Sequence, residues 1–330
     1  MTTMTDDVTA AQGASVTSAR MGAGLLFAIA SALGFALSGP LARGLLDTGW
    51  NAAGVVLVRM SLAALVLLPF GVRAMRGRWS LLARTWRTIA LYGVLAVGGA
   101  QFCYFSAVAH MAVGPALLIE YTAPAAVVVW LWLRHGQRPG ALTLAGAAVA
   151  VLGLVLVLDL LSGGARVSTI GVLWSLGAMV GAATYFIISA DTDNGLPPLA
   201  LATGGLVVGA TTLGLLGAVG LLPMASTTLD TTYAGHAFPW WAPLLALGVV
   251  TAAAAYVLGI IGTRILGSRL ASFVALTEVL AAVVFAWLLL GELPAPIQLL
   301  GGVLILLGVI GVKLGEKSLE IGPDLELDVP

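Results

Sequence analysis

The sequence predicts an all-α integral membrane protein, with ten transmembrane helices arranged as two inverted five-helix repeats. Of its 330 residues, 60% are hydrophobic and only 9% are charged, and the mean hydropathy is +1.05. A soluble domain carries about 25% charged residues, whereas a disordered chain combines low hydrophobicity with high net charge. The 15 basic residues balance the 15 acidic ones, which argues against nucleic acid as a partner. The expected partner is a lipid bilayer.

Ten segments are long and apolar enough to cross the hydrocarbon core, which takes roughly 20 mainly apolar residues. They are 22–42, 50–70, 88–108, 114–133 and 141–160 in the first half, and 169–190, 198–220, 241–262, 270–290 and 297–315 in the second. The polar ends 1–20 and 316–330 are predicted to be disordered cytoplasmic tails. The two repeats then cover 21–164 and 165–315.

The distribution of basic residues predicts the orientation of the chain. With a cytoplasmic N-terminus, twelve Lys and Arg residues lie on the cytoplasmic side and only Arg43 and Arg166 lie outside. This asymmetry agrees with the positive-inside rule. We therefore expect a multi-pass protein of the cell membrane, inner or plasma, with both termini in the cytoplasm.

The end of the second half repeats the end of the first half at an offset of 155 residues. Thr122 aligns with Thr277, and Trp132 aligns with Trp287. Glycines and prolines keep their spacing too: Gly136, Pro139, Gly146 and Gly153 align with Gly291, Pro294, Gly301 and Gly308. Because each repeat has an odd number of spans, the second copy enters from the opposite face. Inverted repeats are typical of secondary transporters, which expose a central site to each side in turn.

Two motifs carry a resemblance to a known family. Glu120-Tyr121-Thr122-Ala123-Pro124 resembles the fourth helix of EamA-type carriers of the drug/metabolite transporter superfamily, and in particular the Glu-Phe-Thr-Gly-Pro run of its amino-acid exporters. Leu276-Thr277-Glu278, with Trp287 to Glu292 and Gln298 to Gly301, is similar to their ninth and tenth helices. The resemblance implies ten helices in two inverted repeats and export of small metabolites, often amino acids or drugs.

Three ionisable side chains lie inside the predicted spans: Arg59, Glu120 and Glu278. Such a group costs about 2.5–3.5 kcal/mol near the bilayer centre, so it usually faces a cavity or a partner. At the offset of 155, Glu120 aligns with Ala275, three residues before Glu278. Residues three apart lie on nearly the same face of a helix, so the two carboxylates occupy approximately equivalent positions in the two repeats. We predict that both line a central cavity and that at least one exchanges a proton during transport. The alternative is a structural network in which Arg59 neutralises Glu120.

Further polar side chains within the spans are predicted to belong to the same substrate or proton pathway. They are Gln101, Tyr104, Tyr121, Tyr185 and Tyr256. A buried hydroxyl group needs a hydrogen-bond partner, which a bound substrate would provide. Ordinary hydrogen bonding between helices is the alternative for each of them.

Two helix breaks are predicted, one at Ser38, Gly39 and Pro40 in the first span and one at Pro124 in the fourth. Broken helices often border transporter sites because the freed backbone groups must face a cavity. Simple helix termination explains Ser38 to Pro40 equally well.

Signals for catalysis, metals and cofactors are missing from the sequence. His110, His135 and His236 lie far apart, Cys103 is the single cysteine, and no Walker-type phosphate loop is present. We therefore predict a secondary active transporter, a monomer or homodimer, that exports a small molecule such as an amino acid or drug-like compound by alternating access with proton coupling. The alternatives are an uncoupled metabolite facilitator and, more remotely, a membrane-embedded lipid-modifying enzyme.

Overall fold

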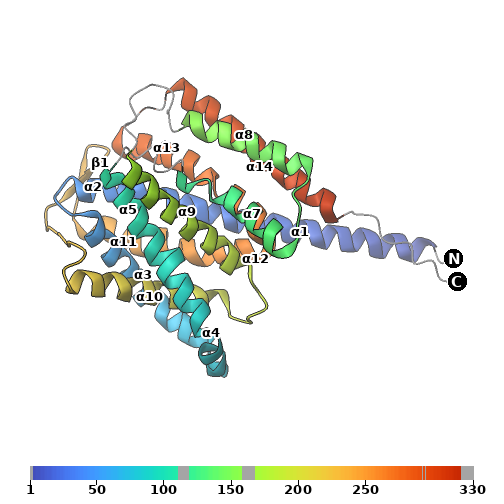
Figure 1. Cartoon of the computed structure of the whole chain (residues 1–330), viewed down its shortest axis with the longest axis horizontal. Coiled ribbons are helices and arrows are strands. Elements are labelled where there is room, and N and C mark those ends of the chain that lie inside the picture. The colour runs from blue at the N-terminus through green and yellow to red at the C-terminus, as the bar shows by residue number, and fades with distance from the viewer. Residues whose placement is uncertain (1–2, 111–118, 158–167, 292, 294, 321–330) are drawn as a thin grey trace.

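The computed structural model describes the chain apart from residues 1–2, 111–118, 158–167, 292, 294 and 321–330 (Figure 1). The first half contains α1 (Thr3–Ala36), α2 (Ser38–Leu46), α3 (Ala52–Ala74), α4 (Trp79–Leu91), the π-helix η1 (Tyr92–Gly99), α5 (Ala100–His110), α7 (Ala123–His135) and α8 (Ala141–Val157). The second half contains α9 (Thr169–Ala190), α10 (Pro198–Ala218), β1 (Thr231–Tyr233), β2 (His236–Phe238), α11 (Trp241–Gly248), the π-helix η3 (Val249–Ala254), α12 (Ala255–Val274), α13 (Thr277–Leu290) and α14 (Pro296–Glu320).

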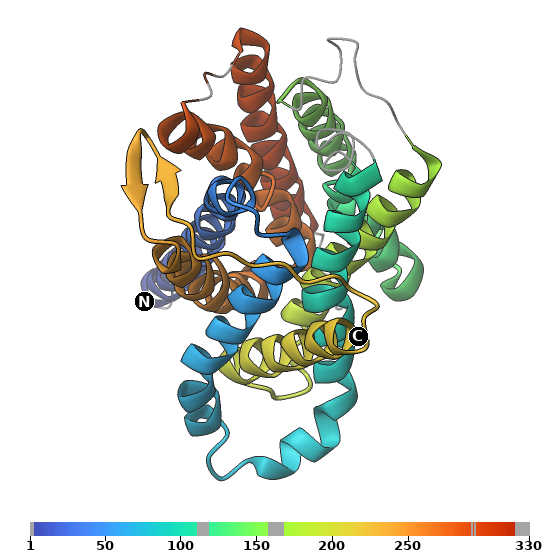
Figure 2. The same ribbon diagram turned by 90° about the vertical axis from the view of Figure 1, so that its left-hand side faces the viewer.

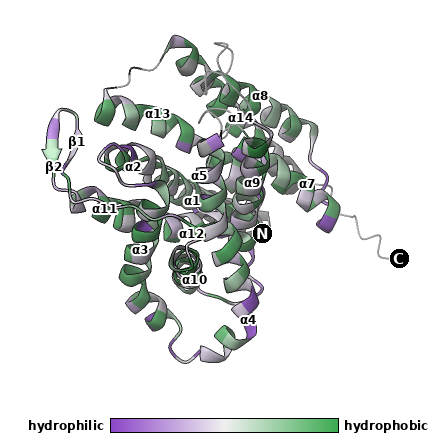
Figure 3. Cartoon of the chain, turned by 60° about the vertical axis from the view of Figure 1, so that its left-hand side comes forward, coloured by the Kyte–Doolittle hydropathy of each residue, from purple (hydrophilic) through white to green (hydrophobic). Residues whose placement is uncertain are grey.

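Several of these helices have the length and composition of membrane spans. Five stretches qualify fully: Arg20–Leu46, Ala52–Ala74, Thr169–Ala190, Pro198–Ala218 and Trp241–Val274. Three shorter apolar helices are Ala141–Leu156, Thr277–Leu290 and Leu299–Gly315. Hydrophobic residues predominate along the helices (Figure 3). Many large apolar side chains are exposed, such as those of Leu65, Leu152 and Leu307. An apolar exterior of this extent suits a protein surrounded by lipid.

Two predicted spans are interrupted by turns: the fourth next to Pro124, where a break was expected, and the ninth, where none was expected. A turn at Tyr121 and Thr122 precedes α7, and a turn at Ala275 and Leu276 separates α12 from α13. In the first case Pro124 has no N–H to donate to the carbonyl of residue 120, which breaks the helical ladder. The N-terminal part of that span, 114–118, lies outside the described residues.

Each interruption is capped in the same way. The Thr122 hydroxyl donates to the carbonyl of Ile119 at 2.6 Å, and the Thr277 hydroxyl donates to the carbonyl of Val274 at 2.7 Å. These residue pairs are related by the offset of 155. In lipid, an unsatisfied backbone group is costly, so the threonine at each break stabilises it.

Both ends of the bundle differ from the predicted tails. Helix α1 begins at Thr3, within the segment 1–20 that was expected to be disordered, and α14 continues to Glu320, past the expected end at 315. Extending an existing helix adds one hydrogen bond for each residue fixed, so these polar stretches continue the apolar helices beside them. The first span also divides slightly earlier than expected, because α1 ends at Ala36 and Ser38 already belongs to α2.

Helices from the two halves pack against each other in matching pairs. Helix α8 lies along α14 (Figure 1), where a β-carbon on Gly146 would lie 2.8 Å from the Gly308 carbonyl oxygen. A β-carbon on Gly153 would lie 2.6 Å from the Gly301 carbonyl oxygen. The two contacts are equivalent under the repeat, because the offset of 155 residues relates Gly146 to Gly301 and Gly153 to Gly308. Similarly, α1 packs on α12, and α5 with η1 packs on α9.

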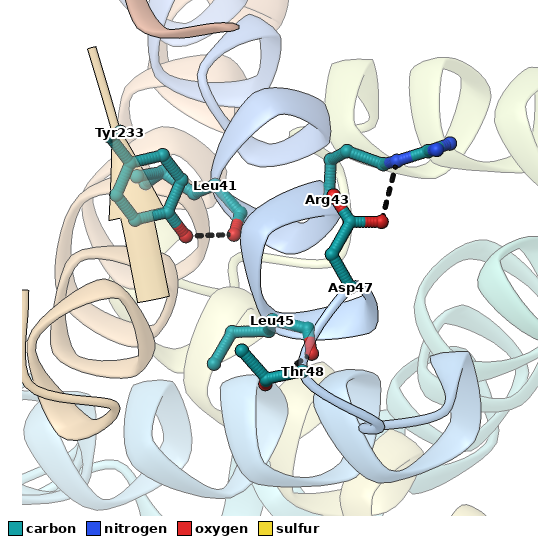
Figure 4. A network of polar contacts seen from close by, with 6 residues as sticks. All are labelled: Leu41, Arg43, Leu45, Asp47, Thr48 and Tyr233. Carbon is teal, nitrogen blue, oxygen red and sulfur yellow. Dashed lines mark hydrogen bonds and ion pairs between the residues drawn. The ribbon is translucent and has the colours of Figure 1, made fainter. Parts of the chain in front are cut away.

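A β-hairpin was not foreseen in the loop 221–240. Strand β1 pairs antiparallel with β2, and the turn residues Ala234 and Gly235 have positive φ angles of 49° and 78°, as two-residue hairpin turns require. The hairpin projects from one end of the bundle (Figure 2) and joins α2 to α13. Tyr233 Oη donates to the carbonyl of Leu41 at 2.5 Å (Figure 4), and the Ala234 N–H donates to the carbonyl of Leu289 at 2.7 Å.

Replacing Gly308 by Ala should lower the free energy of unfolding by about 1–3 kcal/mol, as overpacking does. The new β-carbon would lie 2.5 Å from the backbone nitrogen of Ala150. Thermal unfolding in detergent measures the effect. Gly22→Ala is the matched control, because nothing lies within 4 Å of a β-carbon there. Equal unfolding temperatures for the two variants would contradict the close packing of α8 and α14.

Replacing Tyr233 by Phe should cost about 0.5–1.5 kcal/mol of stability, the usual contribution of one hydrogen bond. Burial raises the pKa of Tyr233 from its usual value near 10 to about 12. The hydroxyl therefore stabilises the fold fully below pH 10 and loses this effect as the pH rises towards 12. Unfolding temperatures of wild type and Tyr233→Phe measured at pH 8 and pH 11 check both statements.

The control for this variant is Arg43→Gln, drawn in the same view (Figure 4). The ion pair of Arg43 with Asp47 is 3.0 Å long but its side chains are 66% and 60% exposed, and exposed pairs contribute little. A larger loss of stability for Arg43→Gln than for Tyr233→Phe would show that the hydrogen bond between the hairpin and α2 is unimportant.

Candidate substrate cavity

A cavity of about 130 Å³ lies inside the bundle and is lined by residues of both halves. Its walls come from α1, η1, α5, α7, α9, α12 and α13 and from the two turns that interrupt the predicted spans. Seven of the predicted residues line it: Gln101, Glu120, Tyr121, Pro124, Tyr185, Tyr256 and Glu278. The space suffices for several water molecules or a small metabolite.

The helix breaks bring the two carboxylates to this cavity. Glu120 directly precedes the turn at Tyr121 and Thr122, and Glu278 lies in the first turn of α13. The partial positive charge at a helix N-terminus favours a carboxylate there. The two glutamates are close enough to interact electrostatically, and the Tyr121 side chain is hydrogen-bonded to Glu278. The cavity therefore holds two acidic groups, of which Glu278 is hydrogen-bonded to Tyr121.

Arg59 lies outside the cavity wall and interacts with Glu278. Its side chain is buried, and Nη2 donates to the carbonyl of Thr251 in η3 at 2.8 Å. Tyr256 is its other electrostatic partner. The structure thus favours Glu278 over Glu120 as the carboxylate that Arg59 compensates, and the pairing stays a prediction. The sequence could not distinguish the two, because both glutamates lie on helices far from α3 in the chain.

Aromatic rings form the part of the cavity wall that α9 and α12 contribute. The ring of Tyr185 stacks on Tyr92 at 6.0 Å between centroids and meets Tyr256 edge-on at 5.9 Å. Phe35 meets Tyr256 edge-on at 5.0 Å. Tyr92 is fully buried behind Tyr185, and its hydroxyl accepts a hydrogen bond from Ser189 at 3.4 Å. Sequence reasoning missed Tyr92, because its position near the end of a predicted span gave no sign of this contact.

The remaining predicted residues lie elsewhere. Tyr104 does not line the cavity but is within electrostatic range of Glu120 and Glu278. Ser38, Gly39 and Pro40 form the start of α2 and also lie away from the wall. In contrast, Ser31, Thr263 and Ser272 line the cavity and were not singled out, since small polar residues within apolar helices are common packing residues.

The cavity wall contains two acidic side chains and, among the residues that the structure describes, no Lys, Arg or His. The described residues also contain no group of three His, Cys, Asp or Glu suited to a metal ion. An apolar helical bundle that encloses a polar cavity of one charge sign defines a membrane transporter.

Comparison with known families identifies the group. A model of the EamA-like transporter family matches residues 22–159 and 169–314. Because these matches cover nearly the whole chain, it belongs to the EamA-like transporter family. The chain is thus a membrane transporter and not an enzyme, as the sequence predicted.

The relatives include proteins named as exporters. The threonine/homoserine exporter RhtA of Salmonella typhimurium (strain LT2) is 27% identical over 268 residues, which cover 80% of this chain and 81% of that protein. A probable terminal-alkyne amino-acid exporter of Streptantibioticus cattleyicolor is 29% identical over 272 residues, covering 81% and 84%. One solved crystal structure matches with a TM-score of 0.72 at 20% identity, covering 91% of this chain and 99% of that one, which supports the fold alone.

The pairing of Arg59 with Glu278 can be tested by a double-mutant cycle. Arg59→Met should destabilise the protein by about 3–5 kcal/mol, because it leaves a buried negative charge without compensation. Adding Glu278→Gln should restore more of this stability than adding Glu120→Gln, which relieves only the repulsion between the two glutamates. Unfolding temperatures in detergent give the coupling of each pair. Equal restoration by both glutamine substitutions would contradict the assignment.

Proposed function

We propose that the chain is a secondary active transporter that exports a small metabolite by alternating access in exchange for protons. The observation that carries the proposal is the presence of Glu120 and Glu278 in one cavity, each next to a helix break. The names of the relatives support an amino acid or a similar compound as the substrate. The absence of a nucleotide-binding motif from the sequence leaves an ion gradient as the source of energy.

The matching contacts of the two halves support two inverted repeats, 21–164 and 165–315. The α8–α14 contacts are reciprocal at an offset of 155 residues, and η1 and η3 lie in corresponding spans. Helices α7 and α13 also end alike, on Gly136 and Gly291 with φ angles of 69° and 74°. Rocking of one such repeat against the other opens a shared cavity to each side in turn. The basic residues favour cytoplasmic termini in the cell membrane.

Proton coupling follows from the charge of the cavity. Holding two negative charges together in a low-dielectric space is costly. The cost falls when a proton neutralises one carboxylate or when a cationic amino group lies between them. A proton and a substrate with an amino group therefore compete for the two carboxylates. Because only one of them is bound at a time, the export of substrate is coupled to the import of protons.

Transport assays in proteoliposomes test the coupling. Glu120→Gln or Glu278→Gln should remove the dependence of substrate efflux on a pH gradient, because the amide neither binds nor releases a proton. The test substrate is radiolabelled L-threonine, chosen from the relatives' names. Asp47→Asn is the control, because this carboxylate is exposed at the bundle's end and its loss should leave the pH dependence unchanged.

Two outcomes would contradict the proposal. Unchanged pH dependence in both glutamine variants would exclude these carboxylates from coupling. A wild-type flux that follows the substrate gradient alone, with no effect of a pH gradient, would identify an uncoupled facilitator instead.

A further inference from the structure

One corner of the cavity contains a buried hydroxyl group whose hydrogen bonding within the protein is incomplete. Tyr185 on α9 is only 9% exposed, and its Oη makes no well-aligned hydrogen bond among the residues that the structure describes, although the Ser31 side chain lies within reach of it. Buried hydroxyl groups are normally paired. Tyr185 also lines the cavity, so a partner for this hydroxyl can come from a molecule bound there.

The surroundings hold the Tyr185 hydroxyl in place. The ring is fixed between Tyr92 and Tyr256 and meets Phe186 edge-on at 4.9 Å. Ser31 Oγ interacts with the Tyr185 hydroxyl in the same corner, although without good alignment, and Ser31 donates its own proton to the carbonyl of Ala255 at 2.8 Å.

Gly259 leaves this corner open. A β-carbon there would collide with Tyr185 Oη and would lie 2.7 Å from Ser31 Oγ. The absence of a side chain at Gly259 is therefore necessary for the hydroxyl to occupy its position. A hydrogen-bond donor that is fixed before binding loses little freedom when a ligand arrives.

The cavity has two chemically different parts. Glu120 and Glu278 accept hydrogen bonds and attract a cation, whereas the corner of Tyr185 offers a neutral donor. No basic residue of the described chain lines the cavity, so the carboxylate of an amino acid finds no cationic partner in the wall. It needs a fixed neutral donor instead.

We propose that Tyr185 recognises the acceptor end of the substrate by donating its hydroxyl proton to a carboxylate or similar oxygen, while Glu120 and Glu278 hold the amino group. This inference rests on the proposed function and deepens it. The cavity selects molecules with a cationic amine at one end and an oxygen acceptor at the other, and Tyr185 is the residue that distinguishes them from simple amines.

Equilibrium binding to purified protein, measured by calorimetry, tests this role independently of transport. The probes are L-2-aminobutyrate and propylamine, which differ only in the carboxylate. Tyr185→Phe should weaken binding of L-2-aminobutyrate about tenfold or more, the effect of losing a hydrogen bond to a charged group. It should leave propylamine binding unchanged. Tyr233→Phe removes the same hydroxyl group far from the cavity and should change neither.

The unfolding temperature of ligand-free Tyr185→Phe separates recognition from structure. It should stay close to that of wild type, because the substitution removes only a poorly aligned interaction with Ser31. A clear loss of stability, an equal loss of affinity for both probes or unchanged binding of L-2-aminobutyrate would overturn the inference. Wild-type protein that binds neither probe would overturn the proposed function as well, whereas normal selectivity without pH-dependent transport would overturn only the proton coupling.

Discussion

The constraint on which this structure depends is that polar groups surrounded by lipid must be satisfied within the protein. Both interruptions in the predicted spans obey it, because the hydroxyl groups of Thr122 and Thr277 each donate to the backbone carbonyl three residues earlier. The same breaks turn Glu120 and Glu278 towards the cavity. A charged side chain and an irregular backbone therefore occur together, where one cavity can accommodate both.

The apolar framework makes this possible by packing closely elsewhere. The α8–α14 contact brings backbones together at Gly146, Gly153 and Gly308, where β-carbons would collide. Hydrophobic burial does not drive helices together in lipid, so close van der Waals contact of small residues has to hold them. The glycine-rich composition thus reflects the packing of the two halves, whereas the few ionisable residues mark the site.

The sequence was a good guide to composition-dependent features and a poor one to contacts between distant segments. Glu120 and Glu278 could be predicted as cavity residues because a carboxylate in an apolar span has few other places to lie. The partner of Arg59, the buried stack of Tyr92 on Tyr185 and the hairpin could not. Each depends on which face of a nearly uniformly apolar helix packs against another helix. The sequence of such a helix has no amphipathic periodicity that would show which face is buried.

The charges around the cavity are unevenly distributed. Arg59 acts on Glu278 through the interior of the bundle, but Glu120 faces a wall without any basic residue among those described. One cation against two carboxylates leaves the cavity short of one positive charge. In a medium of low dielectric constant such a deficit is costly, and it is relieved by one proton or one ammonium group. The proposed exchange of a proton for an amino-group-bearing substrate rests on this imbalance of charge.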